Sequence, residues 1–169
     1  MENEELIRFP NLERVLNEYG QALQDEYKLR LLKDGKTASY NLVDTVRYIY
    51  STNGRKYEIS LNLASYWRFV EYGRKPGKYP PPDKILEWVR IKPLLPRPMK
   101  NGKLPTEKQL AFLIGRKIAE EGIDAGNQLQ DSVEAINHTY MLKIYDAIDK
   151  DIDGIAVTIF NNFSNPKWN

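Results

Sequence analysis

Eight of the ten prolines lie between residues 76 and 105, and this clustering limits where regular structure can form. Proline fixes φ and lacks a backbone N–H, so neither a helix nor a strand continues through such a segment. We therefore expect exposed, irregular loops at about residues 74–82 and 93–105, with one helix between them that starts at Asp83 and ends before Pro93. Structureless loops as long as the second are usually functional or disordered.

Amphipathic helices are expected on both sides of these loops, because apolar residues recur there at spacings of three and four. The first helix has Asn11 as its N-cap and carries Gly20 in its interior, where a glycine costs about 1 kcal/mol relative to alanine. A capping box formed by Thr106 and Gln109 predicts the start of another helix. The predicted helices outside the loop region are residues 11–34, 65–72, 106–122 and 129–150.

Residues 42–51 and 57–63 are rich in β-branched and aromatic side chains and flank Asn53-Gly54, the strongest short signal for a β-hairpin. If this dipeptide forms a two-residue turn, the numbers of cross-strand partners sum to 107, so Tyr50 faces Tyr57. One face of the hairpin is then apolar and the other mostly polar, as in a sheet covered on one side. Alternating apolar residues predict a third strand at 155–163.

These elements predict an α+β fold, in which long amphipathic helices pack on a small antiparallel sheet made of the β-hairpin and a C-terminal strand. The 169 residues are the size of one ordinary domain and are enough to enclose a single hydrophobic core. We therefore expect one domain over residues 1–169, with proline-rich loops at about 74–82 and 93–105.

The inventory of reactive side chains argues against catalysis. The chain has no cysteine and one histidine, His138, which excludes disulfides, thiolate nucleophiles and every Cys-ligated metal site. The chain has neither a secretion signal nor an apolar run long enough to span a membrane, which predicts an intracellular product without membrane association. We expect neither enzymatic activity nor a cofactor.

One acidic segment resembles a metal site. Asp149, Asp151 and Asp153, followed by Gly154, match the opening of a calcium-binding loop. The match then ends, because Phe160 stands where a bidentate glutamate is needed. The sequence favours an acidic helix end followed by a turn, and leaves open whether these aspartates bind an ion.

The near-neutral total charge of +2 hides a strong partition along the chain. Residues 74–117 contain 12 Lys or Arg against 3 Asp or Glu, whereas residues 118–153 contain 9 acidic against 2 basic residues, and residues 1–30 contain 7 against 4. Such blocks favour a surface that meets its complement on another molecule, because opposed patches steer encounter and fix register.

The basic block supplies the candidate interface residues. These are Arg74, Lys75, Lys78, Arg97, Lys100 and Lys103. Their cations are suited either to an acidic protein surface or, with the neighbouring aromatic residues, to the phosphates and bases of a nucleic acid. We favour a protein partner, because no recognisable nucleic-acid-binding module accompanies them. A nucleic-acid-binding module that uses residues 74–103 is the alternative.

Two stretches carry a resemblance to a known family. Residues 66–90 contain Phe-Val-Glu-Tyr-Gly-Arg-Lys-Pro-Gly, and residues 111–123 contain Phe-Leu-Ile-Gly-Arg-Lys-Ile. Together with the order of the expected elements, they resemble the minor tail, tail-completion and neck (head–tail joining) proteins of tailed bacteriophages, particularly those of crAss-like phages. Neither stretch is a catalytic motif.

The resemblance implies a structural virion protein that forms a ring in the neck between portal and tail. The implied assembly is a homo-oligomeric ring, twelvefold or alternatively sixfold, that contacts the portal and other neck or tail proteins while genome DNA passes through the lumen. The implied location is the virion, after assembly in the host cytoplasm. The chain departs from shorter family members in its loop at residues 93–105.

Overall fold

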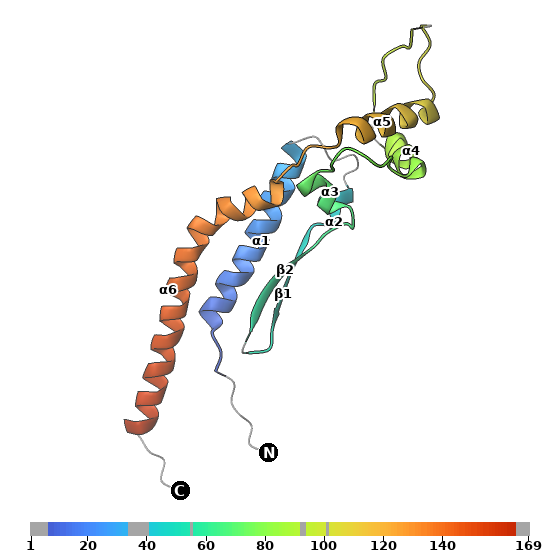
Figure 1. Ribbon diagram of the computed structural model, residues 1–169. Coiled ribbons are helices and arrows are strands. Elements are labelled where there is room, and N and C mark those ends of the chain that lie inside the picture. The colour runs from blue at the N-terminus through green and yellow to red at the C-terminus, as the bar shows by residue number, and fades with distance from the viewer. Residues whose placement is uncertain (1–6, 34–40, 55, 92–93, 101, 165–169) are drawn as a thin grey trace, which may run out of the picture. The chain divides into compact units, whose positions relative to one another are not determined.

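The computed structural model describes residues 7–33, 41–54, 56–91, 94–100 and 102–164 (Figure 1). It contains long helices and one two-stranded antiparallel sheet, which confirms the α+β class. The elements are α1 (Pro10–Lys33), α2 (Asn41–Thr45), β1 (Arg47–Thr52), β2 (Tyr57–Asn62), α3 (Trp67–Tyr72), α4 (Pro82–Ile91), α5 (Glu107–Glu121) and α6 (Gln128–Ser164).

The chain forms two compact units, whose boundaries fall inside α1 and α6. The helix–hairpin unit comprises residues 1–27, 47–62 and 130–169, and the loop unit comprises residues 28–46 and 63–129. The expectation of one domain over residues 1–169 stays a prediction.

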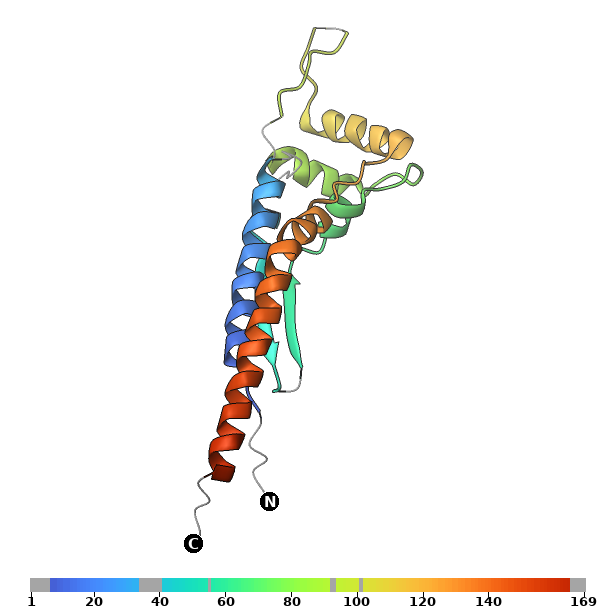
Figure 2. The same ribbon diagram turned by 90° about the vertical axis from the view of Figure 1, so that its left-hand side faces the viewer.

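In the helix–hairpin unit, α1 lies between α6 and the hairpin (Figure 1), and α1 and α6 run side by side in both views (Figures 1 and 2). The hydroxyl of Tyr19 donates to Oδ1 of Asn137 at 2.9 Å, which joins α1 to α6. The backbone N–H of Tyr48 donates to Oε1 of Gln24 at 3.1 Å, which joins the hairpin to α1. A Cβ at Gly20 would lie 2.5 Å from the ring of Tyr48, so the interior glycine makes room for the hairpin.

The faces of the hairpin are as predicted, but its register is wrong by two residues. Tyr50 pairs with Ile59, and Tyr57 pairs with Thr52, so partner numbers sum to 109. Asn53 and Lys56 continue this pairing: the N–H of Asn53 donates to the carbonyl of Lys56 at 3.3 Å, and Oδ1 of Asn53 accepts the N–H of Lys56 at 2.8 Å. The chain therefore turns one position later than predicted. An even shift keeps every side chain on its face, so the half-buried and exposed residues alternate as expected.

Two predicted strand segments are helical. The expected strand at 42–51 begins only at Arg47, because residues 41–45 form α2 and the N–H of Val46 donates to the carbonyl of Leu42 at 3.1 Å. The predicted C-terminal strand at 155–163 is wrong, since α6 continues to Ser164. Its apolar residues also recur at helical spacing, and β-branched residues lower helix propensity by only a few tenths of a kcal/mol.

The other predicted helices are confirmed as α1, α3, α4 and α5, with ends within two residues of those expected. The capping box at the start of α5 is present, with the backbone N–H of Gln109 donating to Oγ1 of Thr106. Residue 34, the last residue of the first predicted helix, lies outside the described residues.

The predicted N-cap of α1 is wrong, because the cap comes from α6. The helix begins at Pro10, a residue well suited to the first helical position. The Asp151 carboxylate accepts the backbone N–H groups of Asn11 at 3.1 Å and Leu12 at 2.9 Å, and also the side-chain amide of Asn11 at 2.7 Å. Asp151 is only 4% exposed. One of the three aspartates of the calcium-like segment is therefore a helix cap.

Candidate interaction surface

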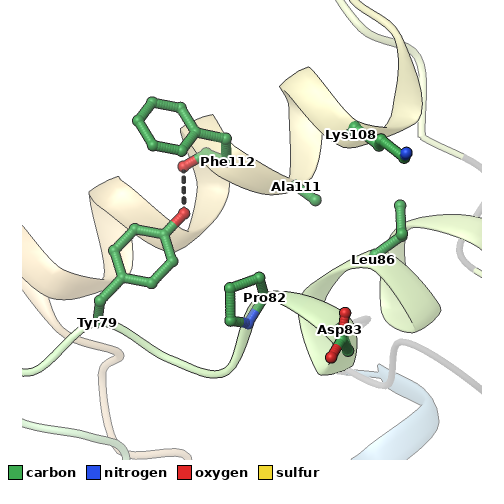
Figure 3. Close-up of a pocket in the computed structure, with 7 residues that line it drawn as sticks. All are labelled: Tyr79, Pro82, Asp83, Leu86, Lys108, Ala111 and Phe112. Atoms are coloured by element: carbon green, nitrogen blue, oxygen red, sulfur yellow. Dashed lines mark hydrogen bonds between the residues drawn. The ribbon is translucent and has the colours of Figure 1, made fainter.

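Near its end, the first proline-rich loop packs against α5 through Tyr79, which makes two contacts with that helix. Its hydroxyl donates to the carbonyl oxygen of Phe112 at 2.9 Å (Figure 3). Its ring lies over Gly115, where a Cβ would come within 2.5 Å of the hydroxyl oxygen. Ala111, one helical turn before Gly115, is buried on α5. Two small residues therefore form the surface of α5 on which the loop packs.

A shallow apolar groove, here the Tyr79 groove, lies beside this contact. Its volume is about 480 Å³, and Figure 3 shows Pro82 and Leu86 opposite Ala111 across it. Its lining residues are Tyr79, Pro82, Asp83, Leu86, Lys108, Ala111 and Phe112. A second hollow of about 590 Å³ shares Tyr79 and Pro82 and is lined also by Phe69, Arg74, Lys78, Pro80 and Pro81. Apolar hollows bordered by cations are suited to binding an apolar segment that carries carboxylates.

The loop at residues 74–82 is pinned at its start to the end of α5. Arg74 and Ile123 exchange backbone hydrogen bonds of 2.8 and 2.7 Å, and the N–H of Gly77 donates to the carbonyl of Ala119 at 2.7 Å. Gly73 and Gly122 both have positive φ, and a Cβ at either would overlap a backbone carbonyl oxygen of the opposite segment. The backbones therefore meet at a spacing that only glycine allows.

The beginning of α6 joins the same cluster. The backbone N–H of Leu129 donates to the carboxylate of Glu71 at 2.9 Å, and Glu71 is buried although it is charged. The N–H of Gly126 also reaches the carbonyls of Val70 and Glu71, each at 3.0 Å. A carboxylate at a helix N-terminus is stabilised by the free N–H groups and by the helix dipole. Glu71, in the middle of the Phe-Val-Glu-Tyr-Gly stretch, is thus a structural residue.

The six candidate interface residues fall into two groups within the loop unit. Arg74, whose guanidinium donates to the carbonyl of Lys78, lies with Lys78 at the second hollow, and exposed Lys75 is in the same loop. Arg97, Lys100 and Lys103 are exposed on the other proline-rich loop, which extends away from α4 and α5 (Figure 1). That loop turns through a hydrogen bond of 2.9 Å from the N–H of Met99 to the carbonyl of Lys103.

Several cations of the basic block are neutralised locally, which concentrates the remaining positive charge in the loops. Arg90 pairs with Glu107 at 3.0 Å, and the other pairs join residues three or four apart on one helix. Among the described residues, no carboxylate lies within ion-pair distance of Lys75, Lys78, Arg97 or Lys100. Because these four cations have no ion-pair partner within the described residues, they are available to bind a partner molecule.

Sequence reasoning noted aromatic residues next to the basic block but did not single out Phe69 or Phe112. Phe69 and Phe112 are each more than half exposed, and the expected helix face at 106–122 did not include Phe112. The spacing of Ala111 and Gly115 is a signal that could have been read, because two small residues one helical turn apart leave a notch for a bulky neighbour.

The described structure does not bring the reactive residues singled out in the sequence together into a metal site. Within the described ranges, no group of three or more His, Asp or Glu side chains is placed to hold a metal ion. Asp149 and Asp153 are exposed on α6, as is His138. None of the described helices is both long and apolar enough to cross a bilayer.

Comparisons of the chain with protein-family models, with curated proteins and with solved structures find no match.

Proposed function

We propose that the protein is a structural subunit of the neck of a tailed bacteriophage, where copies form a ring between portal and tail through which the genome passes. One observation carries the proposal. The two stretches that resemble neck and tail-completion proteins, residues 66–90 and 111–123, are far apart in the sequence but form a single packed module, through the Arg74–Ile123 bridge and the contact of Tyr79 with α5. Two matching stretches that pack against each other support the neck role better than two short matches that are not in contact.

The type of residue in this module supports a structural rather than a catalytic role. Gly73, Gly122 and Gly115 allow close approach of backbones and rings, and Glu71 caps α6. Large apolar side chains are exposed and the charges are segregated along the chain, as expected of a subunit completed by its neighbours. Both twelvefold and sixfold rings agree with these features.

A reconstruction of the phage particle tests this role directly. We expect density for the chain in a ring next to the portal, with the basic loops in contact with a neighbouring virion protein or with DNA. Mass spectrometry of purified particles is the companion measurement. Absence of the chain from mature particles would contradict the proposal.

A second candidate function is nucleic-acid binding through residues 74–103, favoured by the unpaired Lys75, Lys78, Arg97 and Lys100 close in sequence to exposed aromatic residues. DNA affinity measured against salt concentration distinguishes it, since each neutralised phosphate contributes a slope of about −0.9. Replacing Lys75 and Lys78 by glutamine is expected to flatten that slope, whereas Lys150→Gln on α6 should leave it unchanged. No binding at low salt would eliminate this function.

A further inference from the structure

The C-terminal half of α6 presents a stripe of exposed apolar side chains. Tyr145, Ile152 and Ile159 recur every seven residues, and Phe160 and Phe163 extend the stripe to the last turns, where they are 70% and 80% exposed. At roughly 200 Å² for a fully exposed large side chain, these five residues expose on the order of 600 Å². Stable interfaces bury about 800 Å² per partner, so the stripe supplies most of one side of a subunit contact. We call it the α6 stripe.

The charge around the α6 stripe is negative. Residues 151–164 contain no lysine or arginine, and exposed Asp149 and Asp153 border the stripe. Lys150, the nearest cation in the sequence, is paired with Asp146 at 2.6 Å. The last turn of α6 also has no basic residue to complement the negative end of the helix dipole. A surface that receives this helix should therefore be apolar with a basic border.

The Tyr79 groove has these properties. It is apolar, it lies between α4 and α5, and Lys108 is at its edge, while the adjoining hollow carries Arg74 and Lys78. Among the described residues, Lys108 and Lys78 have no ion-pair partner. Asp83 is the single carboxylate in the lining of the groove. An amphipathic helix that lays its apolar face in a groove is a common mode of recognition.

We propose that the α6 stripe of one copy docks in the Tyr79 groove of the next copy, so that each subunit offers its helix to one neighbour and its groove to the other. Charge decides the occupant. If two α6 stripes paired with each other, Asp149 and Asp153 would lie close to the same aspartates of the other copy. Residues 151–164 contain no cation to offset this repulsion, whereas the groove supplies cations. A contact between two different surfaces also repeats around a ring, as a symmetric dimer contact does not. The inference rests on the proposed role as a self-assembling ring subunit.

Mixing two assembly-defective variants tests this contact. The helix variant, Phe160→Asp with Phe163→Asp, has an intact groove, and the groove variant, Lys108→Glu with Phe112→Asp, has an intact helix. We expect light scattering to show oligomers for the unaltered chain, monomers for each variant, and a 1:1 heterodimer for their mixture, because one intact helix meets one intact groove. The control is Leu95→Asp, at a residue that is 98% exposed on the other loop, and it should assemble like the unaltered chain.

Other outcomes overturn the proposal. A mixture that stays monomeric while the unaltered chain assembles means that other surfaces form the contact, for example α6 against α6. An unaltered chain that is monomeric up to its solubility limit excludes the contact, or places the stripe in the groove of its own chain. Circular dichroism checks that each variant is folded, and Phe160→Ser with Phe163→Ser replaces the helix variant if the aspartates reduce its helicity.

The proposed contact and the proposed neck role are contradicted by different experimental results. A heterodimer from the mixture, with the chain absent from particles, would support the contact and contradict the neck role. A ring in the particle without complementation between the variants would support the role and contradict the contact.

Discussion

The two units of this chain differ in the hydrogen bonds that stabilise each unit internally. In the helix–hairpin unit, side chains make the long-range connections, with Asp151 at the start of α1, Asn137 on Tyr19 and Gln24 on the hairpin backbone. The loop unit also has long-range side-chain bonds, made by Glu71 and Tyr79. In addition, its backbone groups bond directly to each other across the Arg74–Ile123 bridge, where glycines allow the approach.

This difference predicts which substitutions each unit tolerates. A side-chain connection is lost when its polar group is removed, at the cost of one or two hydrogen bonds. A backbone connection is insensitive to most side chains but fails when a Cβ is added where the chains touch. The loop unit should therefore be most sensitive at its glycines, and the helix–hairpin unit at a few buried polar residues.

The largest effect is expected for Gly73→Ala. A positive φ and overlap with the carbonyl oxygen of Ile123 together should lower the free energy of unfolding by about 4 kcal/mol, because neither backbone segment can move without breaking the bridge. Gly102→Ala is the matched control, since Gly102 also has positive φ but has no atom near its Cβ position. It should lose only about 1 kcal/mol. Equal losses in chemical denaturation would refute the close-approach argument.

Removing the cap of α1 should have the next largest effect. Asp151→Ala leaves the N–H groups of Asn11 and Leu12 without their acceptor in a buried setting, which should cost about 2–3 kcal/mol. Asp149→Ala, at an exposed residue two positions earlier, should change stability by less than about 0.5 kcal/mol. Thermal unfolding monitored by circular dichroism measures both. A cap that contributes nothing would give the two variants the same midpoint.

Two of the helical glycines, Gly20 in α1 and Gly154 in α6, should respond in opposite directions to alanine. At Gly20 the added methyl meets the ring of Tyr48, and we expect a loss of about 1–2 kcal/mol despite the better helix propensity. At Gly154 nothing lies within 4 Å of the Cβ position, so alanine should stabilise by up to about 1 kcal/mol. Denaturant midpoints for the two variants decide the matter. Stabilisation at both would mean that the hairpin packs less closely on α1.

The smallest effect concerns Tyr19, whose burial raises the pKa of its hydroxyl above the normal value of 10.0. The folded state therefore keeps this proton more tightly than the unfolded state, so its contribution to stability is full below pH 10 and is lost as the pH rises through the raised pKa. Tyr19→Phe removes the hydrogen bond to Asn137 and should cost about 1 kcal/mol at neutral pH. It should also weaken the loss of stability in alkaline solution, as unfolding measured between about pH 8 and 11 would show.

Much of the fold follows from local patterns in the sequence. The capping box at Thr106, the prolines around α4 and the apolar periodicity of α1 act over a few residues, and the structure agrees with them. The hairpin faces were predictable even with the wrong register, because an even shift preserves alternation. Asn53, which the dipeptide signal puts inside the turn, instead bonds to Lys56 through its N–H and its side chain, so the turn lies one position later.

What the sequence did not predict depends on partners distant in the chain. Residues 155–163 alternate like a strand, but a strand needs a neighbour, and helix formation only needs the preceding turn of α6. The sequence left open whether Asp151 binds an ion, because its bond to the start of α1 is invisible in local sequence. The candidate cations were identifiable from charge alone, whereas the Tyr79 groove depends on a loop and a helix that meet only in the folded chain.

The cap on α1 links the first helix to a residue 140 positions later. During synthesis, the opening turn of that helix therefore lacks its cap until Asp151 has left the ribosome, whereas α5 carries a local cap at Thr106. A prematurely terminated product that ends before Asp151 would display an unfinished helix end and an uncovered face of α1. Proteases that digest such fragments would thereby remove defective copies of the chain.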